Sequence, residues 1–144
     1  MSRAVMTRLL SKREVRVGLC LFPDDGEIGG PDACFSYTSF HLFRRRLASA
    51  EGISLDGMQG FGGDIPWSDV RTVLEPLLNH PDDHGRDLTA EECAAMLPRI
   101  EEILPDWLPG ADSDPDMRHQ ERQLRDLISV LQVCVRKGVG MYFL

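Results

Sequence analysis

Long apolar runs are absent from this chain. The longest extends from Val15 to Phe22 and is interrupted by Arg16 and Gly18. A helix that crosses a membrane needs roughly 20 consecutive apolar residues. We therefore expect a soluble protein that makes no contact with a membrane.

Paired cysteine motifs are also missing. The four cysteines are Cys20, Cys34, Cys93 and Cys134, and their spacing matches neither a CxxC motif nor a zinc finger. All except Cys34 lie among apolar residues. We interpret them as small buried hydrophobic residues. The basic N-terminus and its apolar run are followed by turn residues rather than a small-residue cleavage site, which indicates a cytoplasmic protein.

The sequence has no recognisable catalytic motif. It contains no GxSxG, and its glycine cluster at 57–63 is not followed by Lys-Ser or Lys-Thr and follows no convincing strand. Pairs of acidic residues such as Asp24-Asp25 and Glu101-Glu102 are adjacent in sequence, so their side chains point in different directions and do not form a catalytic pair. We predict no catalytic residues and no enzyme.

Length and composition describe one ordinary domain. The 144 residues are 42% apolar and have a net charge of -7. This is enough apolar sequence for a buried core and too much for a disordered chain. We expect a loose basic tail at residues 1–14 and one globular domain at 15–144.

The negative charge is concentrated between residues 79 and 116. That stretch carries eleven acidic residues against Arg86 and Arg99. Such a surface repels a phosphate backbone and attracts basic proteins. We therefore predict no nucleic-acid binding and favour a protein-binding domain, an immunity-type or accessory factor whose acidic surface meets a basic partner.

Hydrophobic periodicity predicts an α+β fold. Residues 15–21 alternate as a strand does, and the short apolar tail 139–144 is suited to pair with it. Four main helices are expected to pack on this small sheet, at about 36–50, 68–78, 90–107 and from the polar linker 109–116 to Gly138. Residues 23–34 have turn chemistry.

Local signals refine these helices. Ser36 or Thr38 is suited to cap the first, and Thr89 with Glu92 forms a capping box for the third. Pro76 and Pro98 are expected to distort the second and third helices. The arginines at 44–46 are interpreted mostly as a solvated edge of the first helix.

The acidic loop after the second helix has an EF-hand-like layout. With Gly85 at loop position six, His80, Asp82, His84 and Glu91 occupy positions one, three, five and twelve. Imidazoles suit calcium poorly, whereas histidines and carboxylates together also suit zinc. The alternative function is thus a calcium- or zinc-binding regulatory domain, with these candidate ligands: His80, Asp82, His84, Asp87 and Glu91. The remaining interpretation is a solvated turn with no cofactor.

Two aromatic residues flank the glycine cluster. Phe61 and Trp67 either pack beneath their loop or are displayed to a partner. Together with Asp82 and Asp83 they are the candidate partner-binding residues. An enzyme that uses His80 or His84 as a base ranks third, and would need these histidines to line a pocket.

Two stretches of the chain resemble a group of small uncharacterised actinobacterial proteins. The shared features are a helix of the type F-x-x-F-R-x-x-L-A-x-A-E-G, a G-F-G-G loop, an acidic loop after L-L-N-H and a short apolar tail. In that group the acidic loop resembles N-H-S-D-x-D-G, with an Asp where His84 stands here. The resemblance covers roughly residues 35–108 and the C-terminal helix and strand. It supports the fold and implies no established activity.

Overall fold

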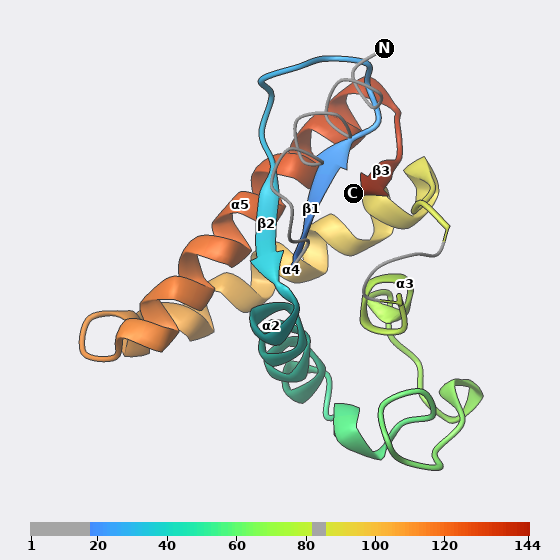
Figure 1. The fold of residues 1–144 in the computed structure, drawn as a ribbon, viewed down its shortest axis with the longest axis vertical. Helices are drawn as coiled ribbons and strands as arrows, with labels where there is room; N and C mark the ends of the chain where they lie inside the picture. The colour runs from blue at the N-terminus through green and yellow to red at the C-terminus, as the bar shows by residue number, and fades with distance from the viewer. Residues whose placement is uncertain (1–17, 82–85) are drawn as a thin grey trace.

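A three-stranded antiparallel sheet joins the two ends of the described chain. The computed structural model describes residues 18–81 and 86–144. Strand β1 (Gly18–Pro23) lies between β2 (Ala33–Ser36) and β3 (Met141–Phe143) (Figure 1). The register pairs Leu21 with Ala33 on one side and with Phe143 on the other. The predicted pairing of the N-terminal and C-terminal strands is confirmed, although Val15 to Val17 and the tail 1–14 lie outside the described residues.

Four helices occur in the described part of the chain and confirm the α+β class. They are α2 (Tyr37–Ala50), α3 (Glu75–Leu78), α4 (Ala90–Ala111) and α5 (Pro115–Lys137). The two long helices α4 and α5 pack together, and α5 contacts β1, β2 and β3 (Figure 1). No helix in residues 18–81 or 86–144 combines the length and apolar character that crossing a membrane requires.

The predicted helix caps are present. The Ser36 hydroxyl accepts a hydrogen bond from the Ser39 amide, and Thr89 and Glu92 form both bonds of a capping box. At the C-terminal end of α5, Gly138 ends the helix in a left-handed conformation with φ of 67°. Local sequence chemistry therefore sets these helix boundaries.

Aromatic rings connect the sheet to the helices. The Phe35 ring of β2 lies 5.1 Å from the Phe40 ring and 4.9 Å from the Phe43 ring, both on α2. Phe43 in turn meets Trp107 of α4 edge to face at 5.6 Å. All four side chains are buried. This part of the core fixes α2 between the sheet and α4.

The predicted helix at 68–78 is wrong. The structure has only a 3-10 turn at Trp67–Asp69 and the short helix α3, and the expected core residue Val73 is 45% exposed. Pro76 lies in the first turn of α3, where the missing proline N–H breaks no helical bond. The proline thus marks where this helix begins rather than a distortion within it.

Helix α4 is longer than predicted. It runs through Pro98, Pro105 and Pro109 and ends at Ala111, within the expected polar linker. The linker is reduced to the three residues before α5, and Asp114 caps that helix through bonds from the amides of Asp116 and Met117. The first part of the linker is helical because its apolar residue Ala111 is buried.

The interpretation of Cys20 and Cys34 as small buried hydrophobic residues is wrong. Cys20 and Cys34 lie directly opposite each other in the β1–β2 register and form a disulfide. The turn residues in 23–34 give no sign of strand β2. Without β2, the sequence does not show that Cys20 and Cys34 face each other. Cys93 and Cys134 are free and buried, as predicted.

Candidate functional site

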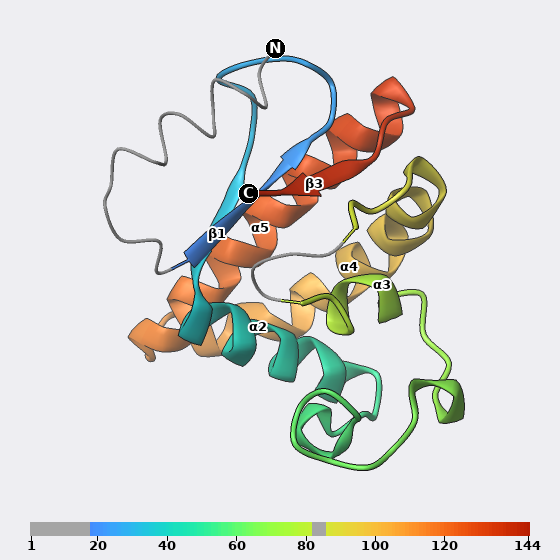
Figure 2. The ribbon, with the colours of Figure 1, turned by 45° about the vertical axis from the view of Figure 1, so that its right-hand side comes forward.

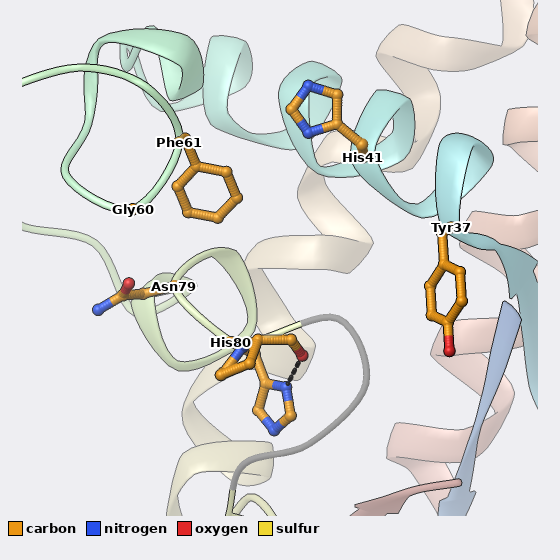
Figure 3. Close-up of a pocket in the computed structure, with 7 residues that line it drawn as sticks. Tyr37, His41, Gly60, Phe61, Asn79 and His80 are labelled. Carbon is orange, nitrogen blue, oxygen red and sulfur yellow. Dashed lines mark hydrogen bonds between the residues drawn. The ribbon is translucent and has the colours of Figure 1, made fainter.

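A pocket lies where α2, the glycine-rich loop and the end of α3 meet. We call it the two-histidine pocket; its volume is about 620 Å³, and among its lining residues are Tyr37, His41, Gly60, Phe61, Asn79, His80 and Pro81. Figure 3 shows Tyr37 and His41 on α2 and Phe61 on the facing loop. In Figures 1 and 2 the segment 51–74 extends beyond the end of α2, away from the sheet. The pocket therefore depends on how this segment and α3 are fastened to α2.

Arg44 makes that connection from within the core. Its side chain is only 1% exposed, and it donates to the carbonyls of Leu77, Leu78 and His80. The guanidinium also lies 4.0 Å from the centre of the Phe40 ring. These carbonyls lie at or just beyond the end of α3, where helical hydrogen bonding stops; the Leu77 carbonyl also accepts from the His80 amide at 3.3 Å. The interpretation of Arg44 as part of a solvated edge is wrong, because its side chain serves these buried acceptors.

His80 is held by main-chain oxygens on both sides of its ring. Its Nδ1 is 2.6 Å from the Pro81 carbonyl and its Nε2 is 2.7 Å from the Arg86 carbonyl. The ring stacks on Phe143 with 3.6 Å between centres. Each carbonyl oxygen occupies the position from which a metal ion would approach that ring nitrogen. In this arrangement His80 closes the acidic loop rather than coordinating an ion.

His41 faces a carboxylate at the rim of the pocket. Its Nε2 lies 3.4 Å from Asp56, which also pairs with Arg45 at 3.3 Å. The His41 ring stacks near Phe61 at 6.3 Å. Among the lining residues that the structure describes, none is a Ser, Cys, Thr or Lys nucleophile. The described walls present aromatic rings and imidazoles to the cavity.

The candidate aromatic residues are both partly buried. Phe61 lines the pocket and meets Trp67 edge to face at 6.1 Å, and both pack against the core. The Trp67 indole donates to the Gln59 carbonyl at 3.0 Å. Their rings thus support the loop from beneath, while Phe61 keeps one surface toward the pocket.

The candidate metal ligands that the structure describes do not form a cluster. Asp82 and His84 lie outside the described residues, as does the candidate partner-binding residue Asp83. Asp87 is half-buried, and Glu91 is exposed in the first turn of α4. Across residues 18–81 and 86–144, no group of three or more His, Cys, Asp or Glu side chains is placed to hold a metal ion.

The end of the acidic loop is fixed to α4 by one ion pair. Arg86 contacts both carboxylate oxygens of Glu92, at 2.7 and 2.5 Å. The hydrogen bond from Arg86 lowers the pKa of Glu92 to about 2, assisted by the Thr89 amide. The loop therefore ends at a carboxylate that stays charged over most of the acidic range.

Acidic side chains form one face of α4. Glu91, Glu101, Glu102 and Asp106 are all exposed and fall within about 140° of the helix circumference at 100° per residue. Glu102 accepts a hydrogen bond from Arg99. The other three form no ion pair with any residue that the structure describes. We call these four residues the acidic face of α4.

Sequence reasoning missed three residues that line the pocket, Tyr37, His41 and Asn79, and also Arg44, which holds its walls together from the core. For Arg44 a signal was present, because it follows Phe40 by four residues and precedes Leu47 by three, on the apolar stripe of α2. A charged residue on such a stripe is buried only with hydrogen-bond partners. For the other three residues no sequence pattern indicates that distant segments converge.

Comparisons with known proteins give no relative. No family model matches the chain, and no curated protein and no solved structure matches it either.

Proposed function

We propose that the protein is a non-enzymatic binding domain that holds a basic protein partner through the acidic face of α4. The observation that carries the proposal is the contrast among the acids of this helix. Glu92 has a cation beside it, whereas Glu91, Glu101 and Asp106 are exposed and have none among the described residues. Unpaired surface carboxylates of one sign attract a basic partner at long range.

The two-histidine pocket supports the same role. Aromatic rings next to a charged surface supply the desolvated contacts that give an interface most of its affinity. Phe61 presents one ring face to the pocket, and the acidic residues Asp82 and Asp83 follow the lining residue Pro81 in the sequence. We propose that an apolar side chain of the partner enters this pocket while basic residues meet the acids. The protein then acts as an immunity-type or accessory factor.

We also propose a cytoplasmic location. A permanent disulfide is uncommon in that compartment, where thiols are kept reduced and disulfides that do form are transient. The location is therefore compatible with the bond between Cys20 and Cys34 only when that bond is reversible.

The test of the binding proposal uses charge neutralisation. A partner captured by the wild-type chain is purified, and its Kd is measured at increasing salt for the variant E91Q/E101Q/D106N. We expect about tenfold weaker binding and a flatter salt dependence, because the lost charges steer association.

A matched control removes the same charge elsewhere. The variant E27Q/D64N/D69N neutralises three exposed carboxylates that form no ion pair in the described structure and lie outside α4. It should bind as the wild type does. Equal weakening by both variants, or binding that does not respond to salt, would contradict a role for the acidic face.

A further inference from the structure

The disulfide between β1 and β2 opens into a second pocket. This cavity has a volume of about 240 Å³ and lies between β2 and α5; Cys34, His119, Arg122, Gln123, Arg125 and Asp126 line it. Cys34 is exposed, whereas Cys20 is half-buried. A thiol that enters the cavity therefore reaches the sulfur of Cys34 rather than that of Cys20. We call this cavity the Cys34 pocket.

The polar groups of the Cys34 pocket are of both signs. Arg122 and Arg125 contribute guanidiniums, and Asp126 contributes a carboxylate. Arg125 also pairs with Glu121 on the same helix. Partial desolvation raises the pKa of Asp126, and the nearby Asp32 carboxylate raises it further. Two cations with carboxylates beside them suit a zwitterion better than a simple anion.

A buried amide in the pocket wall indicates a ligand with a donor group. Gln123 is 4% exposed, and its Nε2 lies 3.3 Å from the Ser39 hydroxyl and 3.2 Å from the His119 ring. Its Oε1 has no hydrogen-bond partner among the described residues. A buried acceptor without a donor costs free energy, which a small shift of the amide toward an N–H of a bound molecule would recover.

We propose that Cys34 is a site of reversible S-thiolation by a low-molecular-mass amino-acid thiol. The carboxylate of the thiol is held by Arg122 and Arg125, and its ammonium group by Asp126. The cavity is smaller than the 300 to 1,000 Å³ of drug-sized sites, which fits a ligand of amino-acid size. The proposal does not depend on the acidic face of α4.

The exchange step balances without another reagent. The thiolate of the small molecule attacks the Cys34 sulfur, a new sulfur–sulfur bond forms, and the bond to Cys20 breaks. The electron pair leaves on Cys20 as a thiolate, which takes a proton from solvent. A second thiolate that attacks the sulfur of the bound molecule gives a free small-molecule disulfide and a fully reduced protein. Attack by Cys20 on Cys34 instead restores the original bond.

The first experiment measures how the oxidised full-length chain reacts with three thiols. L-cysteine carries both charged groups, cysteamine lacks the carboxylate and 3-mercaptopropionate lacks the ammonium. Each rate is divided by the rate of the same thiol with hydroxyethyl disulfide, which removes differences in intrinsic nucleophilicity. We expect the normalised rate of cysteine to exceed that of either analogue by about tenfold, which is the lower end of the rate increase that electrostatic steering gives.

The second experiment tests the two guanidiniums. The variant R122Q/R125Q should lose the preference for cysteine, while R136Q should keep it. Arg136 is an exposed arginine of the same helix and does not line the pocket. A wild-type rate for R122Q/R125Q, or equal normalised rates for the three thiols, would overturn the proposal.

The third experiment locates the adduct. In C20S the Cys34 thiol has no partner to expel the ligand, so reaction with cystine should leave one cysteinyl group that peptide mass analysis finds on Cys34. Cys93 and Cys134 are 0% and 1% exposed and should be labelled only after unfolding. A C34S chain that gains the adduct at Cys20 with the same rate would show that the pocket does not select Cys34, and would reject the assignment.

Discussion

Arg44 donates a hydrogen bond from its guanidinium to the main-chain carbonyl of His80, across the contact between α2 and the end of α3. The same guanidinium reaches the carbonyls of Leu77 and Leu78. His80 begins the acidic loop and lines the two-histidine pocket. The buried Arg44 side chain therefore sets the position of the loop and of the pocket wall. The pocket is thus built on the core rather than on a surface loop alone.

Replacement of Arg44 should therefore be costly. We expect Arg44→Met to lower the free energy of unfolding by about 3 kcal/mol, because it leaves buried carbonyls without donors. Urea denaturation measures the loss. The control is Arg45→Met, which removes an exposed arginine paired with Asp56 and should cost about 1 kcal/mol or less. Equal losses in the two variants would show that the buried contacts contribute nothing special.

Glu92 should give the protein a dependence on acidic pH. Its pKa is about 2 in the folded chain, against 4.5 for an ordinary glutamate, chiefly because Arg86 donates to it. The stabilisation is fully present above pH 4.5 and is lost as the pH falls toward 2. We expect Glu92→Gln to be less stable at pH 7 by about 1 kcal/mol or less, because glutamine can keep the bond to the Thr89 amide but loses the ion pair with Arg86.

The pH profile separates this role from simple loss of a contact. Between pH 4.5 and 2 the wild type should lose stability more steeply than Glu92→Gln, which has no carboxylate to protonate. The control is Glu91→Gln, an exposed neighbour without an ion pair in the described structure, which should retain the steep wild-type profile. Parallel profiles for wild type and Glu92→Gln would contradict the assignment.

Periodicity and capping predicted much of the fold. The caps at Ser36 and Thr89 and the C-terminal strand follow from local chemistry, so the sequence alone identifies them. Strand β2 was missed because its four residues, Ala33–Ser36, are too few to show alternation after a turn-rich stretch. The disulfide was missed with it, since only the strand register places Cys20 opposite Cys34.

The pocket was harder to predict than the fold. His41 and His80 are 39 positions apart in the sequence, and only the tertiary contact through Arg44 brings their segments together. The sequence singles out Phe61 as an aromatic residue in a glycine-rich loop, and the structure packs it against the core on the wall of the pocket. The sequence thus indicates Phe61 as a residue of interest but not the residues that line the pocket with it.

Close backbone contact explains one glycine of the cluster at 57–63. A Cβ on Gly63 would lie 2.1 Å from the Gly57 carbonyl oxygen, which accepts a hydrogen bond from Ile65. We expect Gly63→Ala to lower the free energy of unfolding by about 2 kcal/mol, because the main chain must move. In Gly30→Ala the new Cβ meets nothing within 4 Å, and stability should hold or rise slightly. A Gly63→Ala chain as stable as Gly30→Ala would contradict the close contact.

The ring of His80 leads to a prediction about metal ions. Both of its nitrogens already face main-chain carbonyl oxygens, so a metal could bind His80 only after one of these carbonyls moves away. We expect calcium or zinc, added after chelation, to leave Tm unchanged, because only a ligand that binds the folded state raises its stability. The measurement is a thermal unfolding scan of wild type and Asp82→Ala at increasing metal concentration. Saturable stabilisation that disappears in Asp82→Ala would instead make the loop an ion site, because Asp82 would then be required for the ion to bind.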